Sequence, residues 1–307
     1  MKRLLLAVDG SIASRRGAEF LAHLPHDHAF DLHLISVVRR PIVHRSYATG
    51  EMLDKAFRHD CEHARENQAS IAEIFDGANI QLHHEICEGD ASDVIVRKAK
   101  ELETDLVVLG ATGHSQIGRM LLGSVSDYVA THAPCSVLVI RPPVDDRREG
   151  PLRICLGYDA SGPSQAALEE LMEIPWGARP ELHIVSVATF LSDFFNEKES
   201  ARHYHDDLEL AKNQLSKVAS KVQTHLLEDA HDGEGLVRFT ETHDIDLVVL
   251  GETQRTLLSK WLLGSTSRFV LRHTPCSVWI TRNRMIKGLR GSVIETPLHA
   301  VPPTPLS

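Results

Sequence analysis

The sequence predicts an α/β protein made of two tandem doubly wound, Rossmann-like domains, each with a five-stranded parallel sheet. One observation is a repeat, because DLVVLG stands at residues 105–110 and again at 246–251, 141 residues further on. A repeat of that length is a whole domain and not a solenoid unit. The other is that short apolar runs alternate with stretches of helical periodicity, as expected for strands covered on both faces by helices.

In the first half, five apolar runs are predicted to be strands, at 4–8, 32–38, 81–87, 106–109 and 137–140. Several of them are nearly continuous Val, Leu and Ile, which is typical of parallel strands buried on both faces. Helices are predicted between them at 14–24, 51–75, 92–102 and 125–132. Strand and helix in alternation imply right-handed crossovers and a doubly wound sheet.

The second half repeats this order, with strands predicted at 153–158, 182–187, 224–227, 247–250 and 277–280. The expected organisation is a first domain over 1–141, a linker over 142–151, a second domain over 152–282 and a tail over 283–307. The linker is rich in proline, glycine and charge, as a boundary should be. The tail shows no periodic pattern, so we expect it to be flexible or a loose arm that binds a partner.

Composition narrows the class of protein. The chain has 307 residues, 42% of them hydrophobic and 24% charged, with a net charge of −9. Such a balance fits a soluble globular protein and argues against nucleic acid or anionic membrane as a partner. No apolar run is long enough to span a bilayer, and the run at 4–8 is too short for a signal peptide. The five cysteines lack metal or redox spacing, so we expect a cytoplasmic protein.

A group of glycines follows the strand at 106–109. Gly110, Gly113, Gly123 and Ser124 lead from this strand into the next helix. Glycine lets backbone N–H groups approach phosphate oxygens and can adopt positive φ. Gly123 and Ser124 stand at a helix N-terminus, which favours an anion. Asp9, at the end of the first strand, can accept hydrogen bonds from a ribose or a base at the same edge of the sheet.

These residues resemble the ATP-binding subgroup of the UspA-like universal stress protein superfamily. The spacing G-x2-G-x9-G-[S/T] is filled by Gly110, Gly113, Gly123 and Ser124, and the match covers nearly all of residues 1–282. The resemblance implies that each domain has a five-stranded α/β fold and that Asp9 contacts the ribose and adenine side of ATP. It also implies that the backbone near Val38 faces adenine and that Gly113 and 123–126 cradle the phosphates, with Mg²⁺ held by the phosphates if present. The residues so implied are Ala7, Val8, Asp9, Val38, Leu109, Gly110, Gly113, Gly123, Ser124, Val125 and Ser126.

The second copy departs from this pattern. It keeps counterparts that would form a weaker second site: Asp159, Gly251, Gly264, Ser265 and Thr266. Gln254 stands in place of the second glycine, and its side chain would narrow the phosphate loop. Glu252 stands in place of Ala111, and its charge could repel phosphate. The alternative is that the second copy is a retained scaffold completing a pseudo-dimer.

Other interpretations of these residues stay open. Asp9 could be the N-cap of the helix that follows, and the glycines could serve turn geometry alone. His114 and Arg119 could supply positive charge to phosphates or simply be solvated. Histidine pairs at 59 and 63, 203 and 205, and 26 and 28 invite a metal site, but no third ligand stands at a telling spacing, so no metal is expected.

We therefore expect a cytoplasmic tandem protein that binds ATP, or another adenine nucleotide, and acts as a regulator or sensor in stress response. The sequence has no G-x4-GK[ST] loop and no nucleophile elbow, so no catalytic residue is assigned. The alternatives are a slow ATPase or nucleotide-processing enzyme of the same fold, and an interaction scaffold with vestigial sites. The resemblance also implies that the domains pair through their last strands; a homo-oligomer and an unknown protein partner are further expectations.

Overall fold

The computed structural model describes residues 2–24, 30–41, 50–112, 122–142, 150–174, 176, 179–189, 197–252 and 263–287. In the first repeat the strands are β1 (Arg3–Ala7), β2 (Phe30–Val38), β3 (Ile80–Glu88), β4 (Leu106–Gly110) and β5 (Ser136–Ile140). Between them lie α1 (Ile12–Ala22), α2 (Gly50–Ala72) with the short 3₁₀ helix Glu73–Phe75, α3 (Ala91–Glu101) and α4 (Ser124–His132). Every strand and helix predicted for this half is present.

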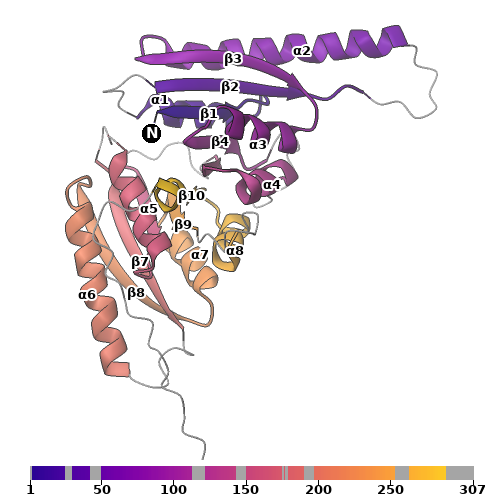
Figure 1. Ribbon diagram of the computed structural model, residues 1–307. Coiled ribbons are helices and arrows are strands. Elements are labelled where there is room, and N and C mark those ends of the chain that lie inside the picture. The colour runs from indigo at the N-terminus through magenta and orange to yellow at the C-terminus, as the bar shows by residue number, and fades with distance from the viewer. Residues whose placement is uncertain are drawn as a thin grey trace, which may run out of the picture.

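The second repeat follows the same order. Its strands are β6 (Arg153–Gly157), β7 (Glu181–Thr189), β8 (Lys221–Asp229), β9 (Leu247–Gly251) and β10 (Ser277–Thr281). Its helices are α5 (Gly162–Glu173), α6 (Glu197–Leu215), α7 (Asp232–Thr242) and α8 (Ser265–His273), followed by α9 (Asn283–Lys287). Figure 1 shows the two repeats side by side, with the long helices α2 and α6 beside the outer strands of their own repeats.

The strands of both repeats form one ten-stranded sheet in the order β3-β2-β1-β4-β5-β10-β9-β6-β7-β8. Pairing is parallel within each repeat, and β5 meets β10 antiparallel with Leu138 opposite Trp279. The last strands thus join the repeats, as expected. In each repeat the strand order reverses direction at the first strand, β1 or β6, which is where an open α/β sheet forms a crevice for a ligand.

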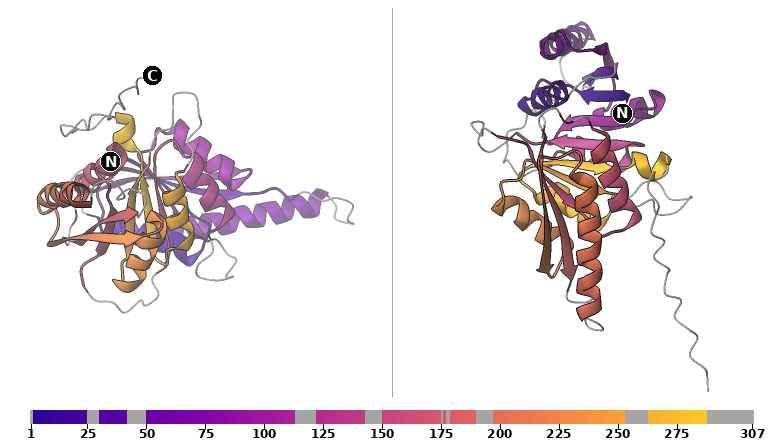
Figure 2. Two further views of the ribbon diagram at one scale, coloured as in Figure 1. Left: turned by 90° about the horizontal axis from the view of Figure 1, so that it is seen from below. Right: turned by 90° about the vertical axis from the view of Figure 1, so that its left-hand side faces the viewer.

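Two apolar cores cover the two faces of the sheet, and both continue across the joint between the repeats. One core packs α1, α2, α5 and α6 against the sheet, and the other packs α3, α4, α7 and α8 against the opposite face. Trp279, 1% exposed, belongs to the first core, and Val278 and Ile280 belong to the second. The joint is therefore continuous protein interior, and Figure 2 shows how closely the two repeats approach.

The structure corrects one expectation for the tail. Residues 283–287 form α9, which packs on α5, with Asn283 and Arg284 buried. The Asn283 amide donates to the Asp105 carbonyl of the first repeat (2.6 Å), and the Arg284 N–H donates to the Glu170 carboxylate (3.0 Å). Because α9 is held by polar groups, its sequence shows no periodic apolar pattern that could have predicted it. Residues 288–307 lie outside the described part of the chain.

No helix among the described residues combines the length and apolarity needed to cross a membrane.

Candidate functional site

The first candidate site lies where β1 and β4 end side by side. Leu6 of β1 is in register with Val108 of β4, so Asp9 and Gly110 both stand just beyond the carboxyl edge of the sheet. The Asp9 carboxylate is exposed and accepts a hydrogen bond from the Ser11 N–H (3.0 Å). The N-cap of α1 is Ser11, whose hydroxyl accepts from the Ser14 N–H, so Asp9 is not the helix cap. Asp9 is left available to a ligand.

The glycines of this site are needed for close approach and not for unusual backbone angles. A Cβ on Gly110 would lie 2.7 Å from the Cβ of Ala13, and one on Gly123 would lie 3.1 Å from the Ala111 carbonyl oxygen. Neither residue is among the described glycines with positive φ, so the capacity of glycine for positive φ is not used at these two positions. Gly123 is the N-cap of α4 and supplies no side-chain cap. The first N–H groups of α4 are therefore left for other acceptors.

The serines after Gly123 differ in role. Ser124 is exposed at the start of α4, where its hydroxyl can reach a ligand. Ser126 is buried, and its hydroxyl donates to the carbonyls of Gly110 (2.6 Å) and Ala111 (3.1 Å). Ser126 thus fixes the start of α4 to the end of β4. Val125, between them, packs against the core.

The remaining residues implied for this site line the strand ends. Val8 and Leu109 are buried, and Ala7 is half-buried at the end of β1. The Val38 carbonyl accepts from the Gly89 N–H (3.1 Å), which ties the end of β2 to the loop before α3. Gly113, His114 and Arg119 lie outside the described residues, as does Gln254 of the second repeat.

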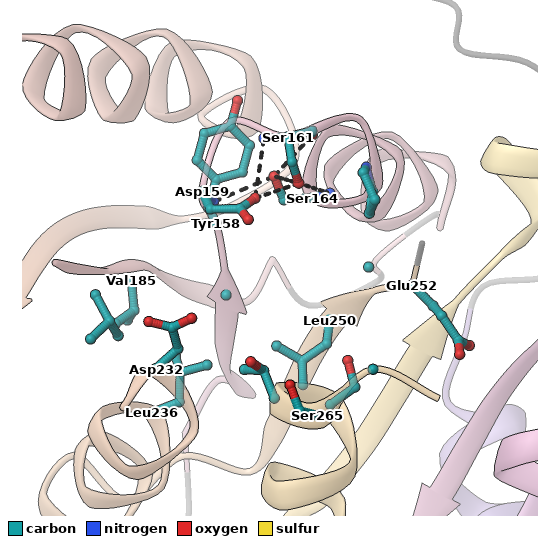
Figure 3. Close-up of a pocket in the computed structure, with 17 residues that line it drawn as sticks. Tyr158, Asp159, Ser161, Ser164, Val185, Asp232, Leu236, Leu250, Glu252 and Ser265 are labelled. Atoms are coloured by element: carbon teal, nitrogen blue, oxygen red, sulfur yellow. Dashed lines mark hydrogen bonds between the residues drawn. The ribbon is translucent and has the colours of Figure 1, made fainter. Parts of the chain in front are cut away.

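The second repeat contains a cavity of about 230 Å³ at the corresponding edge of the sheet (Figure 3). Asp159, Gly251, Gly264, Ser265 and Thr266, which the sequence assigns to the weaker site, all line it. Tyr158, Val185, Asp232 and Leu236 complete much of its wall. The structure therefore brings the predicted residues of the second copy together around one hollow.

The caps and the acidic residue of the first site recur in the second. Asp159 accepts from the Ser161 N–H (3.1 Å), and Ser161 caps α5. Gly264 caps α8 without a side-chain hydrogen bond, as Gly123 does for α4. A Cβ on Gly251 would lie 1.9 Å from the Pro163 carbonyl oxygen, so packing demands glycine there. A Cβ on Gly264 would meet nothing within 4 Å, so the chain's own packing does not demand glycine at that position.

Glu252 does not face a phosphate, and this corrects the expectation of repulsion. Its side chain is 2% exposed and forms an ion pair with the fully buried Arg282. In Figure 3 its carboxylate points away from the other labelled residues of the cavity. Burial raises the pKa of the Glu252 carboxyl, and the Arg282 guanidinium opposes that rise. The charge of Glu252 is thus engaged at the joint between the repeats.

Comparison with known proteins decides the family. The family model of the universal stress proteins matches residues 1–141 and again residues 152–282. The chain belongs to the universal stress protein family. A universal stress protein of Mycobacterium tuberculosis (strain H37Rv) is 24% identical over 293 residues, which cover 92% of this chain and 97% of that protein.

The fold is shared with a solved structure of the family. A universal stress protein from Archaeoglobus fulgidus is similar with a TM-score of 0.62 at 20% identity, covering 91% of this chain and 97% of that one. A universal stress protein family member from Arabidopsis thaliana, solved with AMP bound, has a TM-score of 0.35 at 19% identity and covers 48% of this chain and 97% of that one. Its AMP is a property of that protein, and another solved universal stress protein is in complex with cAMP.

Two arginines at the joint of this tandem universal stress protein were not assigned a role from the sequence. Arg282 donates to the carbonyls of Ala133 (3.3 Å) and Cys135 (3.2 Å) and to that of Ala130 near the end of α4. Arg141, 141 residues earlier, donates to the Leu271 carbonyl of α8 (2.8 Å). The signal that could have found them is that an arginine directly follows the last strand of each repeat.

The two arginines differ in their counter-charge. Arg282 has Glu252, whereas the position equivalent to Glu252 in the first repeat is Ala111. Nε and Nη1 of Arg141 have no hydrogen-bond partner among the described residues, and burial lowers the pKa of this guanidinium. Glu252 therefore supplies the counter-charge of Arg282, and the described residues include no such group for Arg141.

The histidine pairs do not form a metal centre in the described part of the chain, where no group of three or more His, Cys, Asp or Glu residues could hold an ion. His59 and His63 pack edge to face with ring centroids 4.4 Å apart. His26 and His28 lie outside the described residues, and nothing is described of the His203 side chain.

Proposed function

We propose that this universal stress protein binds an adenine nucleotide, with ATP preferred, at the carboxyl edge of β1 and β4. Nucleotide binding then regulates the assembly of the protein or its binding to a protein partner. The observation that supports the proposal most is the glycine-capped start of α4 beside Asp9. An acceptor for ribose hydroxyls and a set of N–H groups for phosphate then stand at one crevice.

The residues present fit such a ligand. Of the helices that start at this edge of the sheet, α1, α3 and α5 are capped by Ser or Asp side chains. The starts of α4, α7 and α8 have no side-chain cap, and α4 and α8 begin at glycines. A free helix N-terminus with the positive end of the dipole favours an anion. In the second repeat the open space above Gly264 is room that a phosphate could occupy.

Linkage between binding and conformation is the proposed mechanism. A nucleotide that holds the segment from Gly110 to Ser124 in one conformation would shift any equilibrium that depends on that segment. We further propose a cytoplasmic protein, since all five cysteines are free in the structure, as is usual in a reducing compartment. A homo-oligomer is proposed as the unit whose assembly the nucleotide changes.

The test is calorimetric titration of ATP into the wild-type chain and Ser124→Asp. Aspartate at the start of a helix favours the helix but repels phosphate, so the variant should fold and lose ATP binding at the first site. Asn213→Asp, on an exposed face of α6, adds the same charge elsewhere and should bind ATP as wild type does. Equal ATP affinity in all three proteins, or none in the wild type, would overturn the proposal. Phosphate release during the titration would point instead to the slow ATPase.

A further inference from the structure

We infer that the cavity of the second repeat is selective for a nucleoside or nucleoside monophosphate over a triphosphate, and that Asp232 determines this selectivity. The inference rests on the proposed function, since it supposes that the family's ligand class enters both repeats. It concerns the difference between the two sites.

Asp232 is the first residue of α7 and lines the cavity. In Figure 3 its carboxylate projects from α7 into the hollow, on the side facing Asp159. Asp232 is exposed to solvent, yet partial desolvation, followed by the charge of Asp159, raises the pKa of its carboxyl. Two carboxylates therefore confront each other across the space that a ligand would enter.

The first repeat has no such pair. The residue at the start of α3 that corresponds to Asp232 is Ala91. The carboxylate next to Ala91 belongs to Asp90, which is ion-paired with Arg39 and also accepts from the Ser92 N–H. No ion pair among the described residues engages Asp232. Among the described residues, the second cavity thus carries one more carboxylate without an ion-pair partner than the first site does.

The described wall of the second cavity offers nothing to offset that charge with a side chain. Among its lining residues none is Lys, Arg or His, and Asp159 and Asp232 are the acidic ones without an ion-pair partner, since Glu252 is paired with Arg282. Two helix N-termini without a side-chain cap reach the described wall, those of α8 and α7, and each is equivalent to about half a positive charge. The start of α7 already carries the carboxylate of Asp232, so the start of α8 is the one left for a ligand anion. This suits one phosphate group better than three.

Specificity of this kind arises from repulsion of the wrong ligand as much as from attraction of the right one. Ribose hydroxyls can donate to Asp159, whose second oxygen accepts no hydrogen bond from the described residues. A single phosphate can occupy the α8 N-terminus. Each additional phosphate adds negative charge that Asp232 and Asp159 disfavour.

The experiment uses the full-length chain carrying Ser124→Asp, so that the first site is silenced. AMP and ATP are titrated by calorimetry into this protein and into the same protein with Asp232→Ala or Asp232→Asn. We expect AMP to bind more tightly than ATP before the second substitution, and ATP affinity to rise about tenfold after it while AMP affinity changes less than about threefold. Ser265→Asp should abolish binding of both nucleotides and so locates the site at α8.

Every other outcome contradicts the inference. Equal affinities for AMP and ATP, or an unchanged ratio in both Asp232 variants, would show that Asp232 does not discriminate. The affinity for ATP could exceed that for AMP in the presence of Mg²⁺ but not of EDTA, and this preference could be lost in Asp232→Asn. That result would show that Asp232 holds a cation. No nucleotide bound in the Ser124→Asp background would refute the inference alone, whereas no nucleotide bound to the wild type would refute the proposed function itself.

Discussion

Replacing Glu252 by alanine tests how the two repeats are held together. The substitution leaves the Arg282 guanidinium, which is fully buried, without its counter-charge. Loss of one partner from a buried ion pair destabilises a protein by about 3 to 5 kcal/mol. Arg282 keeps its three carbonyl acceptors at the end of α4, so we expect the lower part of this range, about 3 kcal/mol.

The measurement is urea unfolding at pH 7, with Glu228→Gln on the exposed side of β8 as the control. Replacing the pair together, Glu252→Leu with Arg282→Met, should recover most of the lost stability because neither charge is then left unpaired. Nucleotide affinity of the second site should not change in Glu252→Ala. A loss below about 1 kcal/mol, or a gain in ATP affinity, would refute this account of Glu252 and restore the expectation of phosphate repulsion.

Three further predictions follow from particular residues. Burial, followed by the charges of His225 and His243, lowers the pKa of His183 to about 4. The contribution of His183 to the free energy of unfolding is therefore present above pH 6.5 and is lost as the pH falls through 4. His183→Gln should flatten that part of a curve of unfolding free energy against pH. Gly251→Ala should destabilise the protein by more than 2 kcal/mol in urea unfolding because of the clash with Pro163, whereas Gly264→Ala should leave stability unchanged and weaken nucleotide binding at the second site; equal effects of the two on stability would contradict this. Trp279→Ala should cost about 3 to 5 kcal/mol in urea unfolding, since the side chain is 1% exposed in the core that joins the repeats, and a loss below 1 kcal/mol would show that the joint is not a shared core.

Much of the fold could be predicted because its buried strands have a simple signature. β1, β4, β5, β9 and β10 lie in the middle of the sheet and are almost wholly apolar. β8 was predicted over 224–227 but extends over Lys221–Asp229, because it is an edge strand whose polar residues face solvent. Apolar runs therefore predict central strands at nearly their full length but predict edge strands too short.

The site could be predicted in outline but not in its charges. The glycine motif placed Gly110, Gly123 and Ser124 correctly at the junction of β4 and α4. The direction of the Glu252 side chain depends on Arg282, which is thirty residues later and meets it only in the folded joint. Asp232 gave no signal, because nothing in a single sequence shows that the start of α7 faces Asp159.

The measurement that tests the central claim most directly is the identity and stoichiometry of the small molecule retained by the purified full-length chain. The protein is denatured, the released ligand is identified by mass spectrometry, and the same preparation is made from Ser124→Asp. The account predicts at least one adenine nucleotide per chain in the wild type, with any triphosphate lost from Ser124→Asp. An adenine nucleotide absent from the wild type even after incubation with millimolar ATP, or a triphosphate retained equally by Ser124→Asp, would contradict it.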